Sequence, residues 1–151
     1  MRTLGALAFV VLGVFALRGV RRAYLAFAAF GLAYFPARAG FRLEPHACDL
    51  ALDAPLAAEA ARNGAHVVLF AIFFVMTVAQ FPRGRRVDVR TLAWAGAATL
   101  VMGALVELAQ GVSGQGNCEL RDLVPDAAGS AIAAATLALA KRFARGAAAH
   151  A

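Results

Sequence analysis

Several enzyme signatures are missing from this 151-residue sequence. It has two cysteines but no Cys-x-x-Cys motif, which argues against a thiol redox enzyme. Ser113 lies in a glycine-rich stretch and Ser130 inside an apolar run, so neither has the setting of a nucleophile. Motifs of phosphatases, rhomboid proteases and CDP-alcohol transferases are also missing. Motifs alone therefore assign no reaction, and whether the chain is an enzyme stays open.

Lysine is almost missing as well, since Lys141 is the only one beside fourteen arginines. This bias, with abundant alanine, is typical of a GC-rich bacterium. Lys and Arg number 15 against 9 Asp and Glu, which gives a net charge of +6. Such an excess could indicate nucleic-acid binding, but the basic residues form short clusters between apolar runs, as in membrane-protein loops. We therefore expect no nucleic-acid partner and a lipid bilayer instead.

Long apolar runs dominate the sequence, in which 62% of residues are hydrophobic, against about 45–50% in a soluble domain. A helix needs about 20 apolar residues to cross a bilayer. We expect an all-α, polytopic membrane bundle of about five transmembrane helices, forming a single domain over residues 1–151. The five apolar segments are Thr3–Leu17, Ala23–Pro36, Gly64–Phe81, Thr91–Ala109 and Pro125–Ala140.

The first two segments allow other interpretations because they are short. Met1–Leu17 could be a signal peptide, but no small-x-small cleavage site follows and a second apolar run does, which favours a retained helix. The two segments could also form a re-entrant hairpin. Two spans are favoured because backbone in lipid must be hydrogen-bonded within its own segment.

The loop charges predict an orientation. The loops after the first and third segments and the stretch after the fifth carry ten basic residues and one acid, Asp88. The remaining loops and the N-terminus carry five basic residues and six acids. Positive residues concentrate on the cytoplasmic side, so the N-terminus is expected outside and the C-terminus in the cytoplasm of a bacterial inner membrane.

Both cysteines, Cys48 and Cys118, fall in loops on the predicted outer side. An oxidising compartment would allow a disulfide between these loops. Two cysteines in different loops can also lie too far apart, since bonding requires Cα atoms within about 7 Å. The sequence leaves the two alternatives open.

Ionisable and polar residues cluster near the predicted outer ends of three segments. His66 opens the third, Glu107 and Gln110 close the fourth on one helical face, and Asp122 and Asp126 open the fifth. Such groups are costly in a membrane and often functional. Asp122 alone is also a candidate helix cap, and the others could act as polar contacts between helices. Together they predict an outward-facing polar pocket.

These residues resemble the VanZ-like family over roughly residues 62–135. The resemblance rests on His66-x-x-x-Phe70, Glu107-x-x-Gln110 and Asp122-Leu-Val-Pro-Asp126-Ala-Ala-Gly129 in that order. The family carries a lysine where Asn63 stands here and an asparagine where Asp126 stands. The resemblance implies a bacterial membrane protein linked to low-level resistance to lipophilic glycopeptides such as teicoplanin; the family's biochemical activity is not established.

Three functions remain in view. The pocket could bind an envelope lipid or cell-wall precursor, with Arg62 and Arg121 meeting a phosphate from the rim. It could instead be an enzyme on a lipid-linked substrate, with His66, Glu107 and Asp122 as catalytic candidates and no cofactor unless a divalent metal such as magnesium binds these oxygens. It could also be a structural or assembly protein. The first is favoured.

Overall fold

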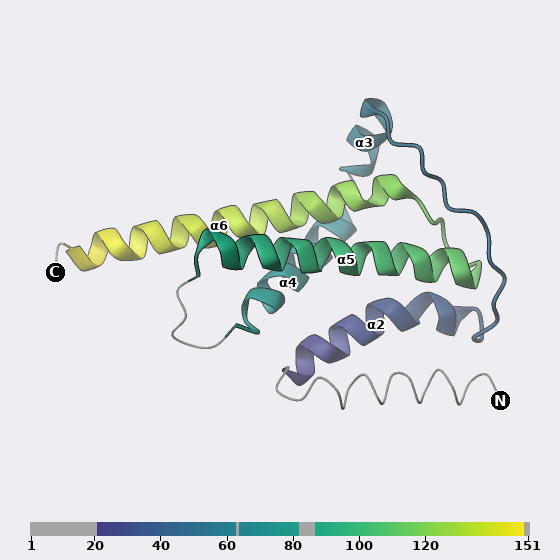
Figure 1. Cartoon of the computed structure of the whole chain (residues 1–151). Helices are drawn as coiled ribbons and strands as arrows, with labels where there is room; N and C mark the ends of the chain where they lie inside the picture. The colour runs from purple at the N-terminus through teal and green to yellow at the C-terminus, as the bar shows by residue number, and fades with distance from the viewer. Residues whose placement is uncertain (1–20, 63, 82–86, 150–151) are drawn as a thin grey trace.

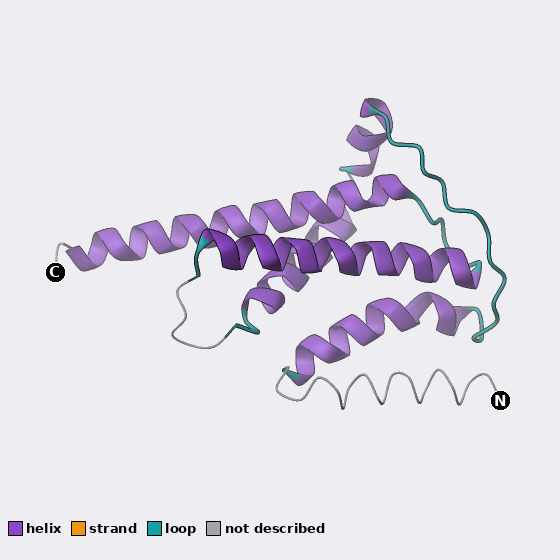
Figure 2. Ribbon diagram, in the orientation of Figure 1, coloured by secondary structure: helices purple, strands orange, loops and turns teal. Residues whose placement is uncertain are grey.

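A computed structural model of the chain describes residues 21–62, 64–81 and 87–149 (Figure 1). Within these ranges the regular structure is helical and contains no β-strand (Figure 2). Four of the five predicted apolar segments are helices, whereas Thr3–Leu17 lies outside the described residues. The helices are α2 (Arg22–Arg38), α3 (Ala54–Ala60), α4 (Gly64–Val78), α5 (Val89–Ser113), a single 3₁₀ turn (Leu120–Asp122) and α6 (Leu123–Ala149).

Two stretches are long and apolar enough to cross a membrane, namely α5 and the stretch Leu120–Arg142. The helices α3 and α4, which are bent by 74° relative to each other, would together provide a third. α2 has 17 residues and rises only about 25 Å, against a hydrocarbon core of about 30 Å. The described residues thus indicate a membrane protein with two or three candidate spans, fewer than the five expected.

The helices expose many of their apolar side chains, as helices in lipid do. Only 28% of the most apolar 18-residue window of α5 is buried inside the protein, and the same holds for the stretch Leu120–Arg142. Buried hydroxyls bond back to their own helix, for example Thr99 Oγ1 to the carbonyl oxygen of Ala95 at 2.7 Å. Such back-bonding leaves no hydroxyl unsatisfied where water is excluded. The large exposed side chains in mid-helix include Val68, Ile72, Val75, Val101, Leu105, Leu108 and Ile132.

The helix boundaries follow from local sequence chemistry. α5 begins after Asp88, whose carboxylate accepts a hydrogen bond from the backbone N–H of Thr91 at 2.8 Å. It ends at Gly114, which has a φ of 66° in the left-handed region that favours glycine. α3 begins in the same way, with Asp53 accepting from the N–H of Leu56 at 2.9 Å. These caps fix where the loops leave the bundle.

The largest contact between helices is that of α4 with α6. It depends on Gly129 of α6, because a Cβ there would collide with the carbonyl oxygen of Val67 on α4. Close approach at a glycine is a common way to pack helices in membranes. Phe74, Ala95 and Ala133 form a buried core where α4, α5 and α6 meet.

α2 packs against α5 and, less extensively, against α4. Its contact with α4 is largely aromatic: the rings of Tyr24 and Phe73 stack with centroids 4.9 Å apart, and those of Phe27 and Phe73 at 5.8 Å. Phe70, Phe73 and Met102 form the buried core beneath α2. None of the residues of α2 is itself fully buried.

The helices alternate in direction, so the loops gather at two ends of the bundle (Figure 1). One end of the bundle holds the N-terminal ends of α4 and α6, the C-terminal end of α5 and the loops 39–53 and 114–119. We call it the polar end. The basic end holds the starts of α2 and α5 and is joined to α6 by Lys141 Nζ, which donates to the carbonyl oxygen of Val87. The described basic residues of this end are Arg21, Arg22, Arg90, Lys141, Arg142 and Arg145.

Candidate functional site

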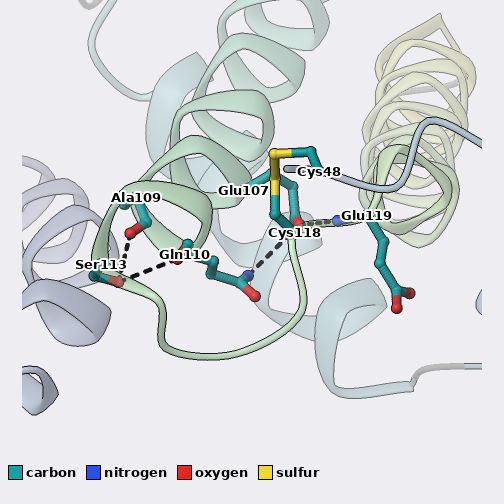
Figure 3. The surroundings of a disulfide bond; sticks show 7 residues. All are labelled: Cys48, Glu107, Ala109, Gln110, Ser113, Cys118 and Glu119. Atoms are coloured by element: carbon teal, nitrogen blue, oxygen red, sulfur yellow. Dashed lines mark hydrogen bonds between the residues drawn. A yellow bond between two sulfur atoms is a disulfide. The ribbon is translucent and has the colours of Figure 1, made fainter. Parts of the chain in front are cut away.

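A disulfide between Cys48 and Cys118 joins loops 39–53 and 114–119 of the polar end (Figure 3). Their Cα atoms are 4.6 Å apart. Backbone hydrogen bonds reinforce the junction: the N–H of Asp49 donates to the carbonyl oxygen of Cys118, and that of Leu120 to Asp49, both at 2.8 Å. Of the two alternatives left by the sequence, the structure therefore has the bonded one.

The bond packs directly on the last turns of α5. A Cβ on Gly111 would lie 3.0 Å from Cys48 Sγ and 3.3 Å from Cys118 Sγ, so the absence of a side chain there admits the sulfurs. The N–H of His46 donates to the carbonyl oxygen of Gly111 at 3.0 Å. Both loops are thus held against the C-terminal end of α5.

Glu107 lies beneath the two disulfide-linked loops and hydrogen-bonds one of them. Its side chain is buried, and one carboxylate oxygen accepts from Gln110 Nε2 at 3.0 Å. The other oxygen accepts from the backbone N–H of Glu119 at 2.9 Å (Figure 3). Glu107 therefore orients the Gln110 amide and fixes the loop that follows Cys118.

A second buried carboxylate, Asp126, holds His66. The Asp126 side chain is 1% exposed, and its Oδ1 accepts from His66 Nδ1 at 3.0 Å. This pair joins the first turn of α4 to the first turn of α6. The carboxylate lies against Gly103 of α5, where a Cβ would collide with Oδ2. Oδ2 has no hydrogen-bond partner among the described residues.

A cavity of about 380 Å³ lies between α2, α4 and α5. The ring of His66 and the amide of Gln110 line it near the polar end, where Tyr34 adds a hydroxyl. The rest of its wall is apolar and reaches toward the middle of the bundle at Phe73 and Met102. The other lining residues are Phe27, Phe30, Gly31, Phe35, Leu69, Phe70 and Val106.

The cavity and the buried carboxylates together form a layered site. His66 and Gln110 face the cavity, and each is held by a carboxylate that does not line it, Asp126 and Glu107 respectively. Asp122 is half-buried and does not line the cavity. The five predicted polar residues therefore do not all line one pocket. Two of them, His66 and Gln110, line the cavity, and Asp126 and Glu107 hold these two in place by hydrogen bonds.

The three remaining predicted residues, Arg121, Arg62 and Asp122, do not line the cavity. Arg121 Nε donates to Glu119 at 2.7 Å, and its Nη1 lies 4.0 Å from an Asp49 oxygen. It thus braces the disulfide-linked loops and does not line the cavity. Arg62 is exposed and makes no salt bridge within the described chain. Asp122 ends the 3₁₀ turn before α6, and its side chain makes no capping hydrogen bond to a described residue.

The divalent-metal alternative does not fit these side chains. Among the described residues, no group of three or more His, Cys, Asp or Glu is placed to hold a metal ion. The reason is geometric, because the Glu107 carboxylate is directed at an amide and a backbone N–H, and one oxygen of Asp126 at His66.

Sequence reasoning missed the contribution of α2. Phe27, Phe30 and Tyr34 line the cavity, and their spacing of three and four residues would have placed them on one helical face. In a helix that is apolar all round, this aromatic stripe did not stand out. The role of Glu119 had no sequence signal, since it contributes its backbone N–H.

Comparison with known protein families, curated proteins and solved structures finds no match to this chain. The resemblance to the VanZ-like family therefore rests on its residues alone.

Proposed function

We propose that this chain is a VanZ-like, multi-pass protein of the bacterial inner membrane that binds an envelope lipid or a lipid-linked cell-wall precursor. The polar head of the ligand meets His66 and Gln110, and the start of its hydrocarbon chain lies along Phe70 and Phe73. A role in the cell envelope, with an effect on teicoplanin susceptibility, is the expected biological context.

The observation that carries this proposal is the amphipathic lining of the cavity. Its volume of about 380 Å³ falls in the range of about 300–1,000 Å³ that is usual for small-molecule sites. Two polar side chains with buried partners stand at one end, and the rest of the lining is largely aromatic and aliphatic. Preorganised polar groups beside an apolar wall suit a ligand with a head and a tail.

The disulfide and the charges support an orientation with the polar end outside. Disulfides persist in oxidising compartments, and Cys48–Cys118 lies at the polar end. The described basic clusters gather at the opposite end, as expected for the cytoplasmic side. With Thr3–Leu17 and α2 as two further short spans, the chain would cross the membrane five times.

The residues of the family resemblance support the same site. His66 and Gln110 line the cavity, Glu107 and Asp126 hold them, and Gly129 allows α6 to approach α4. Residues far apart in the sequence thus serve one small region. The acid at position 126 departs from the family pattern, and here its carboxylate holds His66.

One observation favours an alternative, catalytic function. Asp126 engages His66 Nδ1, while Nε2 has no partner among the described residues and the ring lines the cavity. A histidine oriented in this way by a buried carboxylate can act as a general base. An enzyme acting on a lipid-linked phosphate would use the same cavity. A purely structural or assembly role is the third possibility.

A cavity-filling variant tests the proposal. Val106→Phe adds a ring inside the cavity, and Val101→Phe adds the same ring to the exposed side of α5. Native mass spectrometry of the purified proteins with a polyprenyl phosphate should show at least tenfold weaker binding for the first variant and no change for the second. Equal binding by both variants, at matched folding, would refute a ligand in this cavity.

His66→Gln separates the three functions. In a binding protein it weakens polyprenyl phosphate binding and shifts teicoplanin susceptibility while the protein stays folded. An enzyme would retain binding and lose turnover of the same lipid. Loss of thermal stability in parallel with every phenotype would instead indicate the structural role.

A further inference from the structure

A second cavity, of about 560 Å³, lies at the basic end of the bundle. It is bordered by the same three helices as the first cavity, at the opposite ends of α2, α4 and α5, and by Gln80 and Phe81 just beyond α4. The stacked rings of Tyr24 and Phe73 lie at the boundary, since Tyr24 lines this cavity and Phe73 lines the first. The two sites are therefore distinct.

The chemistry of this cavity favours an anion. Among the described residues that line it, Arg90 is the only charged one and none carries a carboxylate. The guanidinium is exposed and forms no ion pair with any described residue. Tyr24, Thr77 and Gln80 also line the space. The Thr77 hydroxyl donates to Phe73, and the Gln80 amide bonds Met76 and Arg21, so the guanidinium is the group placed to meet an anion. A planar guanidinium can bind a phosphate through two parallel hydrogen bonds.

The surroundings point to a lipid as the source of that phosphate. Trp94 lines the cavity with 61% of its surface exposed, as tryptophans at membrane interfaces often are. Arg21 is held next to the cavity, because its backbone N–H donates to Gln80 Oε1 at 3.0 Å. Basic pockets between transmembrane helices commonly bind anionic lipid headgroups.

We infer that the cavity at Arg90 and Trp94 binds the headgroup of an anionic phospholipid of the surrounding bilayer. The phosphate meets the Arg90 guanidinium, and the acyl chains lie along the exposed apolar surface of α5 beyond Trp94. This site would anchor the basic end to the anionic leaflet and would operate whether or not the first cavity binds a ligand.

The chain provides its own reporter, since Trp94 is the only tryptophan in the sequence. Purified protein in detergent micelles is titrated with phosphatidylglycerol carrying brominated acyl chains, which quench tryptophan fluorescence on contact. We expect saturable quenching, and much weaker quenching with brominated phosphatidylcholine. Soluble glycerol phosphate at the same concentration should not displace the lipid.

The variants separate a specific site from general surface charge. Arg90→Gln should weaken phosphatidylglycerol binding at least tenfold, as expected for loss of hydrogen bonds between charged groups. Arg90→Lys should weaken it less, because the positive charge remains and only the two parallel hydrogen bonds of the guanidinium are lost. Arg142→Gln, an exposed arginine of the same end outside the cavity, should have no effect at about 1 M salt, where the Debye length is about 3 Å.

Three outcomes would overturn the inference. Equal weakening by Arg90→Gln and Arg142→Gln would mean diffuse attraction to the surface. Displacement by glycerol phosphate would mean a soluble ligand. Equal quenching by the two brominated lipids would mean ordinary contact with the bilayer. Val106→Phe should leave the quenching unchanged, so that failure of the first site and failure of this one are distinguishable.

Discussion

Removal of the disulfide should destabilise the protein and loosen its candidate site. The bond joins loops that are 70 residues apart in sequence, and it lies beside the contact of Glu107 with the backbone of Glu119. Replacing Cys48 and Cys118 by serine, singly and together, is the perturbation. Each single variant should behave like the double one, because all three lose the same bond.

The size of the effect follows from the chain entropy that the bond removes from the unfolded state. A closed loop of 70 residues corresponds to about 4.4 kcal/mol at 25 °C. Helices α4 and α5 lie within that loop and remain helical in a denatured membrane protein. Counting only residues 49–63, 79–88 and 114–117, about 29 in all, reduces the value to about 3.6 kcal/mol. We therefore expect a loss of about 4 kcal/mol.

The assay is unfolding by sodium dodecyl sulfate in mixed micelles, followed by circular dichroism. Non-reducing electrophoresis first verifies that the wild type is oxidised. Wild-type protein treated with reductant should match the serine variants. A loss below about 1 kcal/mol, with the bond verified, would refute the idea that this crosslink holds the polar end together.

Three further predictions concern packing, the buried carboxylate and topology. Gly129→Ala should lower the unfolding free energy by about 1–3 kcal/mol, because the new Cβ meets the backbone of α4, whereas Gly96→Ala meets only a ring atom at 3.9 Å and should be tolerated. In the same unfolding assay, Glu107→Gln should cost about 1–3 kcal/mol, since an amide cannot accept both hydrogen bonds, and the exposed Glu59→Gln less than about 0.5 kcal/mol. A C-terminal green fluorescent protein should fluoresce and a C-terminal alkaline phosphatase should be inactive; the opposite result would invert the proposed orientation.

The apolar runs determined most of the helices. Gly64–Phe81 and Thr91–Ala109 are long enough to predict α4 and α5, and the caps at Asp88 and Gly114 account for the remaining residues of α5. The short helix α3 was not predicted, because its seven residues carry no periodic pattern long enough to recognise. Hydropathy could not fix the number of spans, since a run such as Ala23–Pro36 is too short to decide by length.

The candidate site was only partly visible in the sequence. Spacing placed Glu107 with Gln110 and predicted that His66 and Asp126 share one level, because each lies near the same end of its helix. Which carboxylate partners which group depends on helix rotation and approach. Those are set by Gly103 and Gly129, whose missing side chains admit Asp126 and α4 respectively.

The sequence by itself thus determined the class of protein, most of the helices and the end of the bundle at which the polar residues gather, because hydrophobicity and charge act locally along the chain. Only the tertiary structure decided that Cys48 meets Cys118, that His66 and Gln110 alone of the polar set face the cavity, and that α2 supplies its aromatic wall. Those choices depend on side-chain packing between segments far apart in sequence, which no local pattern encodes.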